Sequence, residues 1–148
     1  MAFAPIPEIL EELKAGRMVV LVDDEDRENE GDIVIGAEHC TPQAVNFIVR
    51  EARGVVCLAL TAERCDRLNF HAQSDRNTAQ LGTAFTVTID AHPKFGVSTG
   101  VSASDRSKTI QVAIAEDAQP HDLLRPGHIN PLRARDGGVL VRAGQTEG

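Results

Sequence analysis

Residues 23–32, with the sequence DDEDRENEGD, hold seven acidic side chains and one arginine. The segment lies between two apolar runs of strand length, Met18–Val22 and Ile33–Ala37. Carboxylates at this density cannot enter a core without partners, because the burial of unpaired charge is strongly unfavourable. The sequence therefore predicts two buried strands joined by an acidic connection, which is either solvated or bound to a cation.

Charge is distributed unevenly along the chain. Residues 23–32 carry a net charge of −6, out of −7 for all 148 residues. Residues 125–142 carry four arginines against one aspartate, a net charge of +3. The first segment is suited to cations and the second to anions. The negative total argues against nucleic acid as a partner, because non-specific affinity for a polyanion comes from clustered lysine and arginine.

The acidic segment indicates a site for a hard divalent cation. Its carboxylates repel one another, and closure of the loop beside buried strands should raise several of their pKa values unless a cation compensates. Oxygen ligands favour Mg²⁺ or Ca²⁺ over zinc or copper. An EF-hand is excluded, because the best register starts at Asp26 and places Ala37 at the twelfth position. On composition alone, a solvated acidic turn is the alternative.

The rest of the chain mixes helical and strand patterns without strict alternation. This mixture predicts an α+β fold, an irregular α/β sandwich with a mixed sheet and flanking helices. Hydroxyl groups of Thr41 and Ser104 are suited to cap two of the helices. Residues 69–81 are expected to form a loop. Helices are expected over residues 7–14, 42–54, 61–68 and 104–114, and further strands over residues 55–60, 83–90, 128–132 and 139–142.

Residues 1–148 are expected to form a single domain, since the chain is long enough for one core and too short for two. No apolar stretch approaches the roughly 20 residues that a bilayer span requires, and the N-terminal sequence lacks the regions of a signal peptide. Three cysteines without C-x-x-C spacing favour neither disulfides nor a thiolate zinc site. Cys57, within an apolar run, is expected to be buried and inert. We expect a cytoplasmic protein without a membrane partner.

Five segments in order resemble one enzyme family over nearly the whole chain, the 3,4-dihydroxy-2-butanone 4-phosphate synthases. The resemblance implies the family's fold and its reaction, which converts D-ribulose 5-phosphate to L-3,4-dihydroxy-2-butanone 4-phosphate and formate in riboflavin biosynthesis. It also implies Mg²⁺, or Mn²⁺ as an alternative, stabilising enediolate intermediates, and a homodimer with sites near the subunit boundary. The segments are DEDRENEGD (24–32), GTAFTVTID (82–90), GVSASDR (100–106), RPGHINPLRARDGGVL (125–140) and RAGQTEG (142–148).

The same resemblance implies roles for particular residues. Glu28 and Gln145 occupy the metal-ligand positions, and Gln145 stands where the family commonly has histidine. Arginine can offer a bidentate fork to phosphate, and a threonine at a helix N-terminus can add backbone N–H donors. The catalytic positions are His128, Glu30 and Asp32, and the substrate-binding positions are Arg27, Asp32, Arg142, Gly144, Thr146, Ser104, Asp105, Arg106 and Thr109.

Structural roles are alternatives for several of these residues. Arg27 could act as an internal counter-ion for its acidic neighbours, and His128 could be structural beside its proline and glycine. Ser104 and Asp105 could merely cap a helix.

The family is expected to continue beyond Gly148 with a helix that begins at the phosphate motif and a later strand that carries an acid–base glutamate. We therefore expect the chain to be a fragment of a longer protein that lacks this helix and strand. A fusion to a GTP cyclohydrolase II domain is left open. The alternative function is a non-catalytic sugar-phosphate or metal-binding remnant of the synthase.

Overall fold

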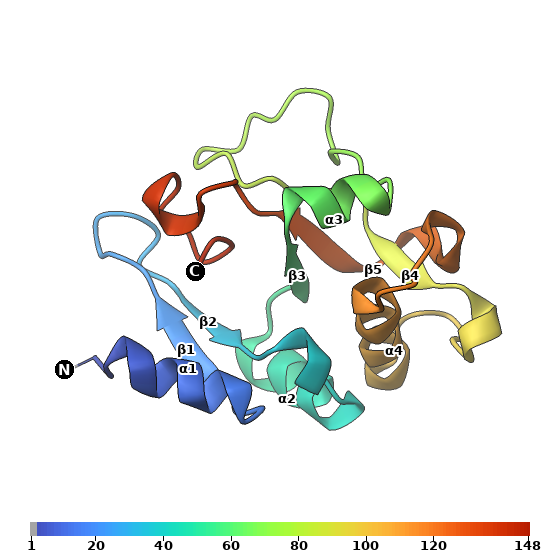
Figure 1. Ribbon diagram of the computed structural model, residues 1–148, viewed down its shortest axis with the longest axis horizontal. Helices are drawn as coiled ribbons and strands as arrows, with labels where there is room; N and C mark the ends of the chain where they lie inside the picture. Colours follow the sequence, from blue (N-terminus) through green and yellow to red (C-terminus); the bar gives the residue numbers. More distant parts are fainter. Residues whose placement is uncertain (1–2) are drawn as a thin grey trace.

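A two-stranded hairpin and a three-stranded sheet form the framework of the fold (Figure 1). The computed structural model describes residues 3–148. Helix α1 (Ile6–Lys14) precedes the antiparallel strands β1 (Val19–Val22) and β2 (Gly31–Val34). Val22 pairs with Gly31 at the end of the hairpin where the connecting loop begins. The acidic segment therefore forms the connection between these strands, as its sequence predicts.

The expectation that these two strands are buried is wrong. Val20 and Val22 of β1 are 65% and 45% exposed. Within the part of the chain that the structure describes, β1 and β2 pair only with each other. Helix α1 contacts β1, and helix α2 (Pro42–Ala52) contacts β2. The second strand also begins at Gly31 rather than at Ile33. Alternate side chains of β1 thus face solvent.

The second sheet is mixed, which confirms the predicted α+β class. Its strand order is β3–β5–β4, with β5 (Leu123–Arg133) at the centre. Strand β3 (Cys57–Leu60) runs parallel to β5, and β4 (Ile89–Ala91) runs antiparallel to it. Ile89 and Ile129 have no exposed surface. Full burial of such side chains contributes about 1.5–3 kcal/mol each, which places the core on this sheet.

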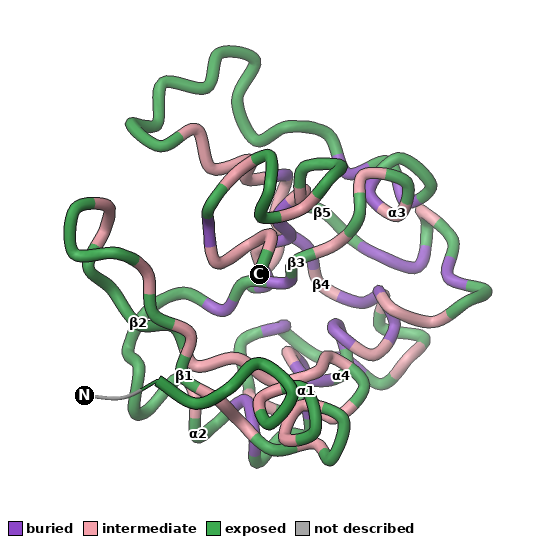
Figure 2. Tube along the Cα trace, turned by 60° about the vertical axis from the view of Figure 1, so that its left-hand side comes forward, coloured by how far each residue is buried: buried purple, intermediate pink, exposed green. Residues whose placement is uncertain are grey.

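Three further helices complete the fold, and one of them, α4 (Ala103–Ile114), packs directly against strands β4 and β5. Hydroxyl groups of Thr41 and Thr61 accept hydrogen bonds from backbone N–H groups three residues later, at Ala44 and Arg64. This local capping explains why both helices begin where the sequence predicts. Figure 2 shows buried segments where α4 meets the sheet. No helix within residues 3–148 is long and apolar enough to cross a bilayer. The helices are α2 (Pro42–Ala52), α3 (Ala62–Arg67) and α4 (Ala103–Ile114), and the short 3₁₀ helices are Ala37–His39, Pro93–Phe95, Pro120–Asp122 and Gly138–Leu140.

The start of α4 differs from the prediction by two residues. Ser102, not Ser104, caps this helix, because its Oγ accepts a hydrogen bond from the N–H of Asp105 at 3.0 Å. Ser104 lies in the first turn and is exposed.

Two predicted strands are wrong or too long. Of residues 83–90, only the end joins β4, while Phe85 and Thr86 make isolated bridges. Residues 139–142 form no strand, since Gly138–Leu140 is a 3₁₀ helix. Leu140 is 95% exposed. Its apolar run has no neighbouring strand within residues 3–148, and a strand needs a partner for its backbone groups.

Candidate functional site

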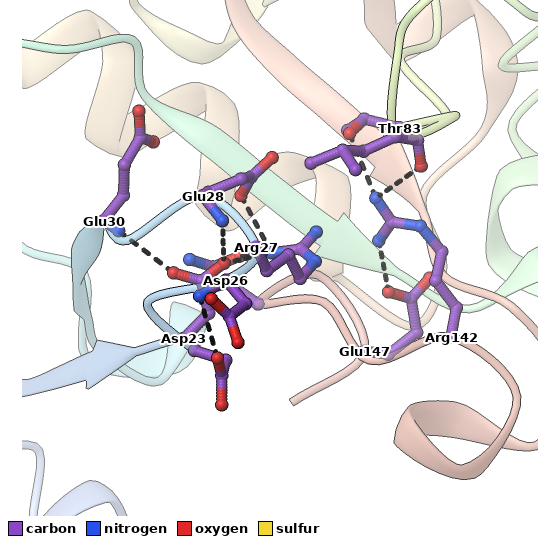
Figure 3. Close-up of polar contacts among 11 residues, drawn as sticks. Asp23, Asp26, Arg27, Glu28, Glu30, Thr83, Arg142 and Glu147 are labelled. Carbon is purple, nitrogen blue, oxygen red and sulfur yellow. Dashed lines mark hydrogen bonds and ion pairs between the residues drawn. The ribbon is translucent and has the colours of Figure 1, made fainter.

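The acidic loop between β1 and β2 folds around the carboxylate of Asp23. Asp23 Oδ1 accepts a hydrogen bond from the backbone N–H of Glu30, and Oδ2 accepts one from that of Glu28, each at 3.0 Å (Figure 3). Asn29 between them has φ of 53°, a left-handed conformation that asparagine tolerates better than most residues. One carboxylate thus fixes the path of the loop.

The guanidinium of Arg27 contacts oxygen atoms of residues near both ends of the chain. Its Nη1 lies 2.5 Å from Asp23 Oδ2, 2.9 Å from Glu28 Oε2 and 3.0 Å from Gln145 Oε1. The Arg27 side chain is only 19% exposed. Arg27 is therefore an internal counter-ion in this structure, as the alternative interpretation predicts. It also brings together the two residues that the resemblance implies as metal ligands.

Within the loop the pKa values of two aspartates shift in opposite directions. Partial burial tends to raise the pKa of Asp23, but hydrogen bonds from Glu30 N–H and from Arg27 outweigh it and leave the pKa below its ordinary value. Burial raises the pKa of Asp32, and the charges of Glu28 and Asp23 raise it further. The expected rise of pKa values therefore occurs at Asp32 and not at Asp23.

A cavity of about 330 Å³ opens beside the acidic loop and is of a size that suits a small ligand. Figure 3 shows Glu28 and Glu30 on one side and Thr83 on the other. The polar pattern of residues 69–81 predicts only a loop and gives no sign that its end forms a cavity wall. The lining residues are Arg27, Glu28, Glu30, Ala79, Gln80, Leu81 and Thr83.

A second hollow, of about 400 Å³, lies between β3 and α3. Its lining includes Arg64 and Arg67, whose guanidinium groups donate to the carbonyls of Ala115 and Glu116 at 2.8 and 2.7 Å. These carbonyls follow the last turn of α4 and have no partner within that helix. The two arginines thus have a structural role, and the smaller cavity is the one that lies at the candidate site.

Arg142 ties the C-terminal segment to the cavity wall. Its Nη1 donates to Glu147 Oε2 at 2.6 Å, and its Nη2 donates to Thr83 Oγ1 at 3.0 Å and to the Leu81 carbonyl at 3.3 Å. The Glu147 side chain is only 1% exposed. The guanidinium fork that the resemblance assigns to phosphate therefore holds an internal carboxylate here, and Glu147 is a site residue that no sequence pattern indicated.

Gly144 and Thr146 lie in a tight turn beside Arg142. A Cβ atom at Gly144 would lie 2.3 Å from Arg142 Nη1, so the lack of a side chain there makes room for the guanidinium. The N–H groups of Glu147 and Gly148 both donate to the Gly144 carbonyl at 3.1 Å. Thr146 thus lies within a single hydrogen-bonded turn.

The polar partner of His128 is Asp90 and not a residue of the acidic loop. Its Nδ1 lies 2.8 Å from Asp90 Oδ2, and its N–H donates to Asp90 Oδ1 at 3.0 Å. Within residues 3–148, no hydrogen bond or ion pair joins His128 to Glu30 or Asp32. The pair that His128 and Asp90 form across β5 and β4 is therefore separate from the contacts of the acidic loop.

Two residues at the start of α4, Asp105 and Thr109, make hydrogen bonds within the fold. Asp105 Oδ2 accepts hydrogen bonds from Ser98 Oγ at 2.8 Å and from Gly100 N–H at 3.0 Å. Thr109 is fully buried and donates to the Asp105 carbonyl while it accepts from Ala91 N–H, both at 2.9 Å. The four positions that the resemblance implies here are not joined to the acidic loop by any hydrogen bond within residues 3–148. They are Ser104, Asp105, Arg106 and Thr109.

Cys57 is exposed, and the expectation that it is buried is wrong. Desolvation nevertheless raises the pKa of its thiol to about 11, and the charge of Asp32 raises it in the same direction. The thiol of Cys57 therefore stays protonated at neutral pH.

The oxygen atoms around Arg27 are suited to a hard cation. Within residues 3–148, no three His, Cys, Asp or Glu side chains converge as an all-protein metal cage would require. Glu28 and Gln145 nevertheless place a carboxylate and an amide oxygen on one cationic nitrogen. Mg²⁺ is usually held by one or two carboxylates and keeps waters or substrate oxygens as its other ligands. The donor set fits Mg²⁺ on this basis.

Comparisons with known proteins agree with this chemistry. The family model for 3,4-dihydroxy-2-butanone 4-phosphate synthase matches residues 7–148. The chain is 55% identical over 147 residues to the synthase of Pseudomonas syringae pv. tomato, covering 99% of this chain and 39% of that protein. It is 54% identical over 145 residues to the riboflavin biosynthesis protein RibBA of Aquifex aeolicus, covering 98% of this chain and 36% of that protein.

Solved structures show the same relationship. A crystal structure of a 3,4-dihydroxy-2-butanone 4-phosphate synthase in complex with two magnesium ions superposes with a TM-score of 0.94 at 44% identity, covering 98% of this chain and 67% of that one. A cation-free form of such a synthase gives a TM-score of 0.89 at 43% identity, covering 99% and 66%. The chain spans well under half the length of the first two relatives. It belongs to the 3,4-dihydroxy-2-butanone 4-phosphate synthase family.

Proposed function

We propose that the protein converts D-ribulose 5-phosphate to L-3,4-dihydroxy-2-butanone 4-phosphate and formate, with Mg²⁺ as its cofactor. The observation that carries the proposal is the convergence of Glu28 and Gln145 on one cation beside a cavity of about 330 Å³. Family membership supports the same reaction. The two products together contain all the atoms of the substrate, so the conversion needs no external oxidant or reductant.

The residues around the cavity are suited to the two ends of this substrate. Arg27 contributes a cation to the cavity wall, and Arg142 lies behind Thr83 on the opposite wall. A phosphate group could compete with Glu147 for the Arg142 fork, because both present paired oxygen atoms to it. The sugar hydroxyl and carbonyl groups would then face the acidic loop, where Glu28 lines the cavity.

Asp32 is suited to hold and transfer a proton. Burial and the neighbouring charges of Glu28 and Asp23 keep its pKa above that of an ordinary aspartate. General acid–base catalysis is favoured when the pKa of the group lies closer to the working pH, and the pKa of Asp32 is shifted in that direction. Mg²⁺, when bound by Glu28 and Gln145, would supply Lewis acidity to adjacent substrate oxygens. Glu30, which lines the cavity, is the second candidate for proton transfer.

His128 would serve this reaction from outside the acidic loop. Asp90 holds one ring nitrogen of His128 and so orients the imidazole. We propose that the protein acts as a homodimer and that Mn²⁺ can replace Mg²⁺. The exposed apolar side chains of β1, Val20 and Val22, support an association of subunits.

Formate release tests the proposal directly. The protein is incubated with ribulose 5-phosphate and Mg²⁺, and formate is quantified against the four-carbon product. We expect equal amounts of both, and we expect Glu28→Gln to lower the rate by on the order of 100-fold or more, since a metal's charge stabilisation is worth several kcal/mol. Glu25→Gln is the matched control, because Glu25 is exposed in the same loop. Binding of ribulose 5-phosphate without any formate would instead support the non-catalytic alternative.

A further inference from the structure

Arg27 Nη1 lies where the oxygen atoms of three side chains converge. Asp23, Glu28 and Gln145 each place one oxygen within 3.0 Å of it. A guanidinium Nη nitrogen carries only two hydrogens, so it cannot give three acceptors a well-directed hydrogen bond each. The positions of the three oxygen atoms are therefore explained better by attraction to a positive charge than by the directions of the guanidinium N–H bonds.

We infer that Arg27 is a built-in counter-cation that holds Glu28 and Gln145 together in the metal-free protein and must release both when a divalent cation binds. This inference rests on the proposed function in that Mg²⁺ is the cation. A divalent ion needs its oxygen ligands at about 2.0–2.6 Å, and the same oxygen atoms now contact a cationic nitrogen at 2.9 and 3.0 Å. Two cations cannot share these oxygen atoms without strong repulsion.

Asp23 determines where Arg27 goes after the exchange. Its carboxylate contacts Nη1 at 2.5 Å and is held by backbone N–H groups on both of its oxygen atoms. Asp23 can therefore keep the guanidinium while Glu28 and Gln145 leave it. Because Arg27 already lines the cavity, the released N–H donors would face an anionic substrate there. Metal binding would thus prepare Arg27 as a positioning residue for the substrate.

Calorimetric titration with MgCl₂ alone, at fixed ionic strength, tests the competition. We expect Arg27→Gln to bind Mg²⁺ about tenfold more tightly than the wild type, because a competing charge beside the site is removed. Arg17→Gln is the matched control, since Arg17 is 59% exposed and pairs with Glu12 outside the site, and it should bind Mg²⁺ as the wild type does. Equal or weaker binding by Arg27→Gln would overturn the inference.

A measurement on the unaltered protein covers the case in which Arg27→Gln disturbs the loop. Hydrogen exchange at the Arg27 guanidinium is followed by ¹⁵N NMR before and after addition of MgCl₂. We expect hydrogen exchange at this guanidinium to become faster with Mg²⁺, because two of its three acceptors are lost. An unchanged rate of hydrogen exchange at saturating Mg²⁺ would contradict the release of Glu28 and Gln145 by Arg27.

If neither protein binds Mg²⁺, both the inference and the metal of the proposed function fail. If the competition holds but no formate forms, only the proposed reaction fails.

Discussion

Asp23 does more for the acidic loop than any other carboxylate, since it accepts two backbone N–H groups and the Arg27 guanidinium. These bonds hold its pKa below the ordinary value although burial opposes them. A carboxylate with a lowered pKa stabilises the folded state above the pKa of the unfolded chain, about 3.9 for aspartate, and loses that contribution as the pH falls toward its folded value.

Asp23→Asn should therefore lower the melting temperature at pH 7, and the difference from the wild type should shrink as the pH falls below about 4. Thermal unfolding followed by circular dichroism at several pH values measures this. Asp26→Asn makes the same chemical change three residues later at an exposed position, and should leave the melting temperature nearly unchanged. A difference for Asp23→Asn that is independent of pH would show that its charge is not what matters.

At the scale of elements, α4 offers a test of which serine caps it. Ser102 Oγ accepts from the N–H of Asp105, whereas Ser104 is exposed in the first turn. Loss of an N-cap side chain costs about 1 kcal/mol, so Ser102→Ala should lower the free energy of unfolding in urea by about that much. Ser104→Ala should be neutral or slightly stabilising, because alanine is the better helix former. A larger loss of stability for Ser104→Ala than for Ser102→Ala would instead identify Ser104 as the cap, as the sequence alone predicts.

The elements that the sequence predicts well are those with local signals. Thr41 and Thr61 begin helices because the hydroxyl accepts a hydrogen bond from an N–H group only three residues later in the chain. Residues 139–142 carry a strand-like apolar run, but strand formation depends on a neighbour that the sequence does not reveal. The same limit applies to the site. The acidic run indicates a cation, yet its contact with Gln145 spans 118 residues and only folding brings the two together.

On the scale of the whole molecule, burial is distributed unevenly. Helix α1 and strands β1 and β2 contain no buried residue, while Ile89, Ile110 and Ile129 are at most 2% exposed around the mixed sheet. A two-stranded hairpin is marginally stable without a hydrophobic face to pack against. The acidic loop is therefore carried by elements that contain no buried residue, where a change of ligand partners at Arg27 disturbs little packing.

This distribution predicts that the hairpin opens without the core. In native-state hydrogen exchange read by mass spectrometry, amides of residues 19–34 should lose protection at lower urea than those of α4 and β5. Ile110→Ala, which leaves a cavity against the sheet, should lower the protection of α4 and β5 by about 2–5 kcal/mol. Because Ile110 belongs to the core and not to the hairpin, the hairpin amides should be unaffected. Equal loss in both regions would mean that the acidic loop unfolds only with the whole domain, and that any exchange of cations there must occur within a rigid frame.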